Sequence, residues 1–349
     1  MGKKVKLVAV IETEDNTLLD DAAIERSVGV LGIVKSYEVS LDTGESGDKA
    51  TEKVSQTSAS SSEMKSFINN SNKIYFGNLS PEERVSVGIT LLHSSNLEKI
   101  QKDSNFKNNI MQMFINKFSD DESYVNKLIA DTNDDSLFET LKSKFLEGDL
   151  TQMFIFLWQT CLSKGDEDDF EVELLESTAE KFSFEKPEIG ETKKQGNERA
   201  KVSKAIDSIN SGAVAYNKLK AFEKSVLVGL LLTECSTIDG KISQDDLRIL
   251  KNLLNAQFGI TSNASIVLVE RDLGYSLTKK VEQVEVYREK YELVEFLWER
   301  VLSTEEDIKD EEMELIRKMV RRLDISDVES EGARKEVEQN LYPDGEKDE

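Results

Sequence analysis

The chain has 349 residues, of which 38% are hydrophobic, and 45 Lys and Arg against 68 Asp and Glu give a formal net charge of -23. This length is typical of about two domains. A strongly negative chain repels phosphate backbones and anionic lipid surfaces, so we expect a protein partner rather than a nucleic acid or a membrane. No run of about 18 apolar residues is present, so no membrane span is predicted. Cys161 and Cys235 stand far apart without a CxxC pair, which is typical of a cytoplasmic protein and argues against a disulfide framework or zinc site.

The N-terminal region has a different pattern from the rest of the chain. Residues 4–12 and 28–40 are rich in Val, Ile and Tyr and flank a segment with helical spacing. This predicts a small strand-helix-strand element over residues 1–45. Residues 46–66 are dominated by Ser, Thr, Gly and charged side chains, which cannot bury enough apolar area to offset their ordering entropy. We predict a flexible linker there.

Residues 67–185 are predicted to form a helical domain. Ser80, Pro81 and Glu83 form a helix start, with Ser as N-cap, Pro at the first position and Glu completing a capping box. Apolar residues then recur at helical spacing through Phe114 and Phe118 to Trp158. Amphipathic helices of this kind are stable only when they pack on one another. The fold class is therefore mainly α.

The second half repeats the first at an offset of about 140 residues. Phe156-Leu157-Trp158 returns as Phe296-Leu297-Trp298, and Val87-Gly88 returns as Val228-Gly229. The repeat keeps apolar spacing and loses polar identities, so we predict a duplicated helical bundle whose function lies in what the copies do not share. Trp158 and Trp298 are predicted core anchors.

The repeat sets the remaining domain boundaries. Residues 186–199 contain Pro187, Gly190 and a charged run, and we interpret them as a linker between domains. The second helical domain then covers residues 200–338. Its apolar stripes include one through Val281, Val284, Tyr287 and Tyr291. Residues 339–349 are predicted to be an acidic tail.

The sharpest local motif runs from Thr237 to Asp246 between two apolar stripes. In a calcium loop of the helix-loop-helix kind, Gly240 would make the sharp turn and Asp239 and Asp246 would be ligands. The first and third positions of such a loop would be Cys235 and Thr237, which leaves too few carboxylates for a complete EF-hand. The alternative is an Asp-Gly turn followed by an acidic helix cap.

The same residues resemble the TerB-like family, named for tellurite resistance. The resemblance rests on Asp239-Gly240-Lys241-Ile242-Ser243-Gln244-Asp245-Asp246-Leu247 and on the later run Glu292 to Trp298, and it covers about residues 217–335 with a weaker echo over 80–185. It implies two tandem TerB-like all-helical domains. Only Asp239 and Asp246 match the acidic positions of the family's turns, because the later turn of the second copy has Glu305-Glu306 instead.

Catalytic groups are the next class to consider. His93, the single histidine, has no surrounding GxSxG or HExxH frame and is predicted to end a helix. No glycine-rich phosphate loop is present. Cys161 and Cys235 each close an apolar stripe, which favours small buried side chains over reactive thiols. The basic cluster from Arg317 to Arg322 is predicted to complement a helix end, with a docking patch as the alternative.

Three hypotheses follow. The first is a non-enzymatic acidic helical module that binds a protein, in the stress or tellurite-resistance setting that the resemblance implies. The second is a regulator that responds to calcium or another divalent cation through Asp239 and Asp246. The third is a structural adaptor that docks through its N-terminal element.

Overall fold

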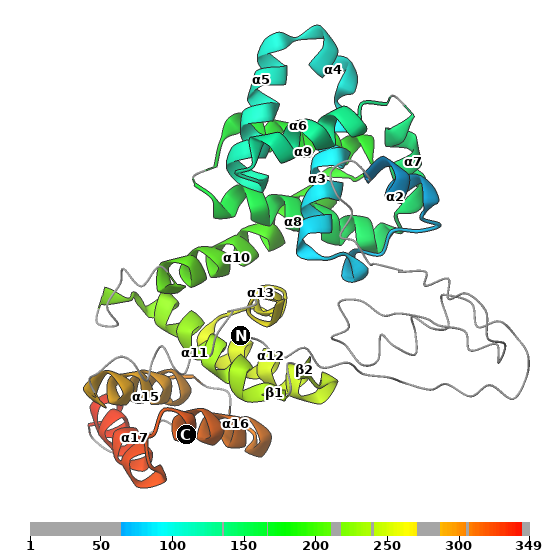
Figure 1. The fold of residues 1–349 in the computed structure, drawn as a ribbon. Coiled ribbons are helices and arrows are strands. Elements are labelled where there is room, and N and C mark those ends of the chain that lie inside the picture. Colours follow the sequence, from blue (N-terminus) through cyan, green and yellow to red (C-terminus); the bar gives the residue numbers. More distant parts are fainter. Residues whose placement is uncertain are drawn as a thin grey trace, which may run out of the picture. The chain divides into compact units, whose positions relative to one another are not determined.

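The computed structural model describes residues 64–134, 136–165, 167–210, 218–238, 241–270, 287–304 and 307–343 (Figure 1). The predicted strand-helix-strand element at residues 1–45 lies outside the described residues, as does most of the predicted linker at 46–66. The rest is mainly α, as expected, with one antiparallel pair of two-residue strands.

The elements of the first half are helices joined by short turns. In chain order they are α2 (Met64–Asn70), η1 (Phe76–Asn78), α3 (Pro81–Ser95), α4 (Leu97–Lys102), α5 (Ser104–Met113), η2 (Phe114–Phe118), α6 (Glu122–Asp131), α7 (Leu137–Lys144), α8 (Glu147–Ser163), α9 (Asp169–Lys181) and α10 (Lys186–Asn210). The second half contains α11 (Ala221–Ser236), β1 (Thr237–Ile238), β2 (Lys241–Ile242), α12 (Gln244–Phe258), α13 (Ser265–Glu270), α15 (Tyr287–Leu302), α16 (Asp310–Arg322) and α17 (Asp327–Leu341).

The start of α3 confirms the predicted capping box. The Glu83 backbone N–H donates to Ser80 Oγ at 3.2 Å, and the Ser80 backbone N–H donates to Glu83 Oε2 at 2.8 Å. Pro81 occupies the first helical position. A backbone N–H there has no acceptor within the helix, so the missing N–H of proline costs no hydrogen bond. The start of the helix is therefore set by local chemistry, and His93 lies in the last turn as expected.

The apolar side chains form two clusters. One runs from Met64 to Ala200 and contains Trp158, and the other runs from Val202 to Val337 and contains Trp298. The two tryptophans are 1% and 5% exposed, which confirms that they are core anchors. The change from one cluster to the other falls inside α10, between Ala200 and Val202. One continuous helix therefore contributes to both cores.

The predicted linker at residues 186–199 is wrong, because these residues form the first half of α10. Ile189 and Thr192 are 5% and 2% exposed, so one face of the charged segment is buried. A Cβ on Gly196 would lie 2.3 Å from the Cβ of Trp158 and 3.0 Å from the Ile155 carbonyl oxygen. Glycine at this position thus lets the α10 backbone lie directly against α8.

Several helices of the first half recur in the second at a nearly constant offset. Residues 81 and 221, which begin α3 and α11, are 140 apart, and residues 186 and 327, which begin α10 and α17, are 141 apart. The turns that precede α10 and α17 also match. Ser183 and Asp324 have φ of 72° and 58°, and each donates its backbone N–H to the carbonyl three residues back. A left-handed residue other than glycine at the same place in both halves marks a shared backbone design.

Two predicted boundaries differ from the structure. Met64 was assigned to the linker, but it opens α2 and is 0% exposed in the first core. At the other end α17 reaches Leu341, so residues 339–341 of the predicted tail are helical. Both errors arise because short helical ends with few apolar residues have no periodic signal of their own.

Candidate functional site

The predicted cation site lies where α11 turns into α12. β1 and β2 pair antiparallel, with Thr237 opposite Ile242, so the chain reverses between the two helices. Asp239 and Gly240 lie outside the described residues. Asp246 occupies the first turn of α12, where its backbone N–H donates to Ser243 Oγ at 3.1 Å.

The Asp246 carboxylate has a structural partner. Ser243 Oγ donates a hydrogen bond to Asp246 Oδ2 at 2.6 Å, and Ser243 is the N-cap of α12. This is the turn-and-cap arrangement that the sequence left open as an alternative. Within the residues that the structure describes, no group of three or more His, Cys, Asp or Glu side chains could hold a metal ion. Among the described residues, Asp246 therefore belongs to no such group.

A buried ion pair lies in the first core. Lys117 Nζ is 3.2 Å from Glu171 Oε2, and the two side chains are only 11% and 10% exposed. Lys117 also donates to the Cys161 carbonyl oxygen at 3.2 Å. Burial raises the pKa of Glu171, whereas the ammonium group of Lys117 lowers it. The pair joins η2 to α8 and α9, and its charges satisfy each other in the interior.

The second core has different polar partners at the corresponding positions. At the repeat offset, Gln257 stands for Lys117 and Glu312 stands for Glu171, and both are buried. The Thr304 hydroxyl donates to Gln257 Oε1, and the Lys309 backbone N–H donates to Glu312 Oε2 at 3.1 Å. At this level of both cores the buried polar side chains have hydrogen-bond or ion-pair partners, which indicates a structural role.

His93 is buried at 3% exposure near the end of α3. Burial, with a smaller contribution from Lys107, lowers the pKa of His93 to about 4, so the imidazole is neutral at physiological pH. Its Nδ1 has no hydrogen-bond partner. In the described part of the chain, a buried imidazole with a lowered pKa and no hydrogen-bond partner at Nδ1 is not arranged as a general base.

The cysteines differ in burial. Cys161 is buried as predicted, and desolvation raises the pKa of its thiol. Cys235 is half-buried rather than buried, because it lies near the end of α11. Burial, followed by the charge of Glu234, raises the pKa of Cys235 to about 11. Both thiols are therefore protonated at neutral pH, which disfavours nucleophilic chemistry.

The basic cluster of α16 is engaged in ion pairs. Arg321 lies 3.1 Å from Asp327, and Arg322 lies 3.8 Å from Glu234. Arg317 lies 3.7 Å from Glu314. The cluster thus ties the end of its own helix to α11 and α17, in agreement with the predicted helix-end role.

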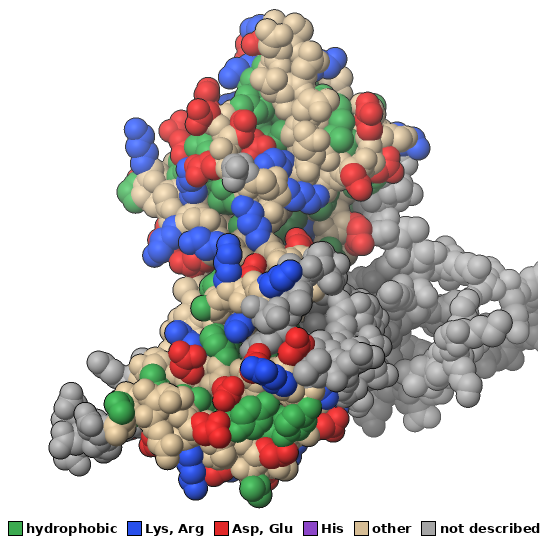
Figure 2. All heavy atoms as spheres, turned by 90° about the vertical axis from the view of Figure 1, so that its left-hand side faces the viewer, with side chains coloured by type: hydrophobic (Ala, Val, Ile, Leu, Met, Phe, Trp, Pro, Cys, Tyr) green, Lys and Arg blue, Asp and Glu red, His purple; other side chains and the backbone are tan. Residues whose placement is uncertain are grey.

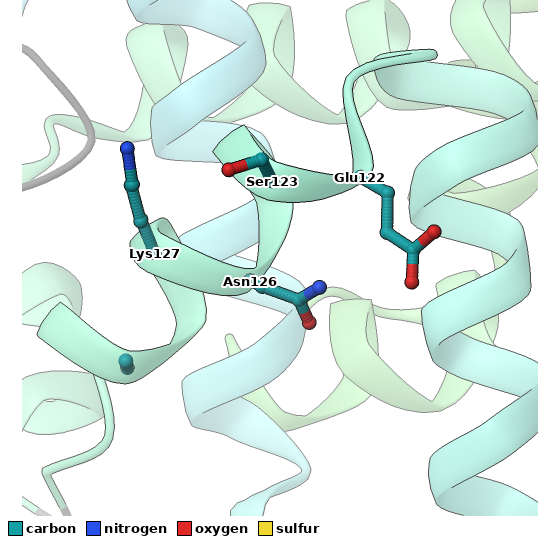
Figure 3. Close-up of a pocket in the computed structure, with 5 residues that line it drawn as sticks. Glu122, Ser123, Asn126 and Lys127 are labelled. Carbon is teal, nitrogen blue, oxygen red and sulfur yellow. The ribbon is translucent and has the colours of Figure 1, made fainter.

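A shallow depression of about 530 Å³ lies on α6 (Figure 3). Its lining residues all come from that one helix: Glu122, Ser123, Asn126, Lys127 and Ala130. In Figure 3 the labelled side chains point away from one another rather than toward a common centre. A single helix that lines an open depression encloses no ligand.

The most exposed apolar side chains among the large ones lie on α15 and α17. Tyr287 is 54% exposed and Val328 is 83% exposed. The sequence placed Tyr287 in an apolar stripe and therefore in the core, which is wrong. The Tyr287 ring stacks on Tyr291 with ring centroids 6.4 Å apart, and the Tyr287 hydroxyl donates its hydrogen to Glu329.

We define the tyrosine-carboxylate face as Tyr287, Tyr291, Glu292, Glu295, Glu329 and Glu336. Figure 2, which looks at the side where Figure 1 draws α15 and α17, shows hydrophobic side chains open to solvent among Asp and Glu in the lower part of the view. Comparison of the two copies could have revealed this face. Tyr287 and Tyr291 are aromatic, whereas the residues 140 positions earlier, Glu147 and Thr151, are polar.

Comparisons with protein-family models, with curated proteins and with solved structures found no match. None of the helices in the described part of the chain is long and apolar enough to cross a membrane. The functional argument consequently rests on this chain's own residues.

Proposed function

We propose that this chain is a non-catalytic, acidic helical module of the cytoplasm that acts by binding a protein partner. The TerB-like resemblance of residues 217–335 supports two tandem domains of that family and a stress-response setting. The observation that carries the proposal is the exposure of Tyr287, whose hydroxyl donates to Glu329, and of Val328 on helices whose other faces form the core. Apolar side chains left open on a packed scaffold are typical of a protein-binding surface.

The polar interior supports the same proposal. Lys117 pairs with Glu171 in the first core, and at the surface Asp246 accepts a hydrogen bond from Ser243 at the start of α12, so these groups have structural partners. Arg199 is 3% exposed and donates to Gln152 Oε1 and to Asn263 Oδ1, each at 2.8 Å. These bonds tie α8, α10 and the turn before α13 into one scaffold.

The test is reconstitution from purified components. Affinity purification of the full chain identifies candidate partners, and isothermal titration with each purified candidate then measures stoichiometry and Kd. We expect saturable binding at a fixed stoichiometry. Failure of every purified candidate to bind, or turnover of a substrate by the purified chain, would contradict the proposal.

A further inference from the structure

The edge between α8 and α10 in the first half already holds a chain segment. Thr261 donates its hydroxyl hydrogen to Glu198 Oε2 at 2.8 Å, and Asn263 Nδ2 donates to the Gln195 carbonyl oxygen at 3.0 Å. Arg199 bonds to Asn263 from the same helix. The turn at residues 261–263 therefore docks on α10 through polar side chains, beside α8, to which Arg199 is joined through Gln152.

The matching edge in the second half is formed by α15 and α17. At the repeat offset Glu336 stands for Gln195, and Glu295 stands for Ile155, which is 0% exposed. Among the described residues, no hydrogen bond or ion pair ties a segment like 261–263 to this edge. In the part of the chain that the structure describes, the edge that is occupied in the first copy therefore has no such segment in the second, and its side chains there are the tyrosine-carboxylate face.

The charge of the face sets the chemistry of the occupant. Glu292, Glu295, Glu329 and Glu336 contribute four carboxylates to the face. The pKa of Glu295 is raised by burial and then by repulsion from Glu336 and Glu292. Among the described residues, Arg288 forms an ion pair with one of these carboxylates, at 2.8 Å from Glu292. A cationic group placed there relieves the repulsion between carboxylates, which a neutral or acidic segment does not.

The two tyrosines favour arginine in particular. Tyr287 and Tyr291 stack at an interplanar angle of 27°, and Tyr287 is more than half exposed, so a guanidinium group can lie on its ring. A second copy of the chain does not fit, because the net charge of -23 makes two copies repel.

Resting on the proposed function, we infer that the tyrosine-carboxylate face of α15 and α17 is the docking site for an arginine-rich segment of the protein partner. The segment lies along the edge between the two helices, as residues 261–263 lie along the edge between α8 and α10. Its guanidinium groups pair with Glu295 and Glu336 and stack on Tyr287.

The test uses the full chain and a fluorescein-labelled peptide of five Arg-Ser repeats, with the corresponding Glu-Ser peptide as a probe of charge sign. Fluorescence anisotropy is expected to show saturable binding of the Arg-Ser peptide alone. Glu295→Gln with Glu336→Gln should raise its Kd about tenfold, since two charge pairs are lost. The matched control is Glu98→Gln with Glu173→Gln, whose side chains are 82% and 79% exposed and which changes the net charge equally. This control should leave the Kd within about twofold.

A second pair of variants separates the aromatic contribution from charge. Tyr287→Ala should raise the Kd about threefold to fivefold, since a cation–π contact at an exposed site is lost. Tyr75→Ala removes a tyrosine of similar exposure, 47%, from the first half and should have no effect. Hydrogen exchange should slow on residues 287–302 and 327–341 when the peptide is bound. Thermal melts of each variant confirm that the fold is intact.

Equal weakening by the two carboxylate pairs, binding of the Glu-Ser peptide, or no binding of either peptide would overturn the inference. Binding of the purified partner with a Kd unchanged by Tyr287→Ala and by Glu295→Gln with Glu336→Gln overturns the docking site alone and leaves the proposed function standing. Failure of the intact chain to bind any purified partner overturns the proposed function whatever the peptide does.

Discussion

Lys117 and Glu171 form an ion pair that is almost removed from water. Replacing Lys117 by Met leaves a buried carboxylate without its partner, so we expect a loss of about 3–5 kcal/mol in the free energy of unfolding. The double variant Lys117→Met, Glu171→Leu removes both charges and should recover most of that loss. Urea denaturation measures both. A double variant as unstable as the single one would show that packing, not charge, decides the effect.

The single variant Lys117→Met also predicts the direction in which stability changes with pH. Burial raises the folded-state pKa of Glu171, and loss of the Lys117 ammonium raises it further. At pH values between the unfolded and the folded pKa of Glu171, the native state then binds more protons than the unfolded state. The free energy of unfolding of Lys117→Met should therefore rise as pH falls from neutral towards the unfolded pKa of Glu. Stability that instead falls over this range, relative to wild type, would contradict this assignment.

His93 allows a direct titration because it is the single histidine of the chain. We expect its imidazole C–H resonances in NMR to titrate near pH 4 in the folded protein, since burial lowers the pKa of His93 to about 4. The pKa of His93 is lower in the folded state than the unfolded value of about 6.5. Its contribution to the free energy of unfolding is therefore fully present above the unfolded pKa and is lost as pH falls toward the folded pKa. The difference corresponds to about 3 kcal/mol between pH 7 and pH 4. A midpoint near 6.5 would show that the side chain is solvated.

At the scale of elements, α10 depends on glycine at one position. Gly196→Ala would place a Cβ 2.3 Å from the Cβ of Trp158 and within 3.0 Å of α8 backbone atoms, so the helices must separate. We expect a loss of about 1–3 kcal/mol. Gly190→Ala is the control on the same helix, because nothing lies within 4 Å of its Cβ. That change should instead stabilise the chain by up to about 1 kcal/mol. Chemical denaturation measures the free energy of unfolding of both variants. Similar values for the two would argue against close packing of α10 on α8 at Gly196.

The first turn of α12 separates the structural and cation-binding hypotheses. Ser243→Ala removes the N-cap that Asp246 shares, and we expect a loss of about 1 kcal/mol with or without calcium. A ligand that binds only the folded state would add about 2.7 kcal/mol at 100 times its Kd. Thermal melts in calcium and in chelator should therefore coincide for the wild type. A calcium-dependent shift that Asp246→Ala abolishes would instead support the cation-binding hypothesis.

The sequence predicted those elements that carry their own periodic or capping signal. The α3 capping box and the buried Trp158 and Trp298 follow from local patterns, and the structure confirms them. The α10 helix was missed because its buried face uses Thr192 and Gly196 in place of a run of large apolar residues. The pairing of Lys117 with Glu171 joins residues 54 positions apart, which no local pattern contains. Tyr287 was misplaced because spacing assigns a residue to a face of its helix but does not show whether another element covers that residue.

At the scale of the whole molecule, the two cores share α10. The first cluster ends at Ala200 and the second begins at Val202, and both side chains are 1% exposed on the same continuous helix. Local unfolding of one core therefore frays the helix on which the other depends. We expect residues 64–343 to unfold in a single cooperative transition, because the cost of breaking α10 couples the two clusters.

Lys201 provides the test of this coupling, because it is exposed and lies between the two clusters. Lys201→Pro removes one backbone hydrogen bond and clashes with the preceding turn, which costs about 3 kcal/mol and interrupts α10 at the boundary. We expect differential scanning calorimetry to show one transition for the wild type and for Lys201→Ala, and two for Lys201→Pro. The calorimetric and van't Hoff enthalpies should agree in the first two proteins and diverge in the third. A single transition in Lys201→Pro would mean that the bonds of Arg199 and Asn263, rather than the helix, carry the coupling.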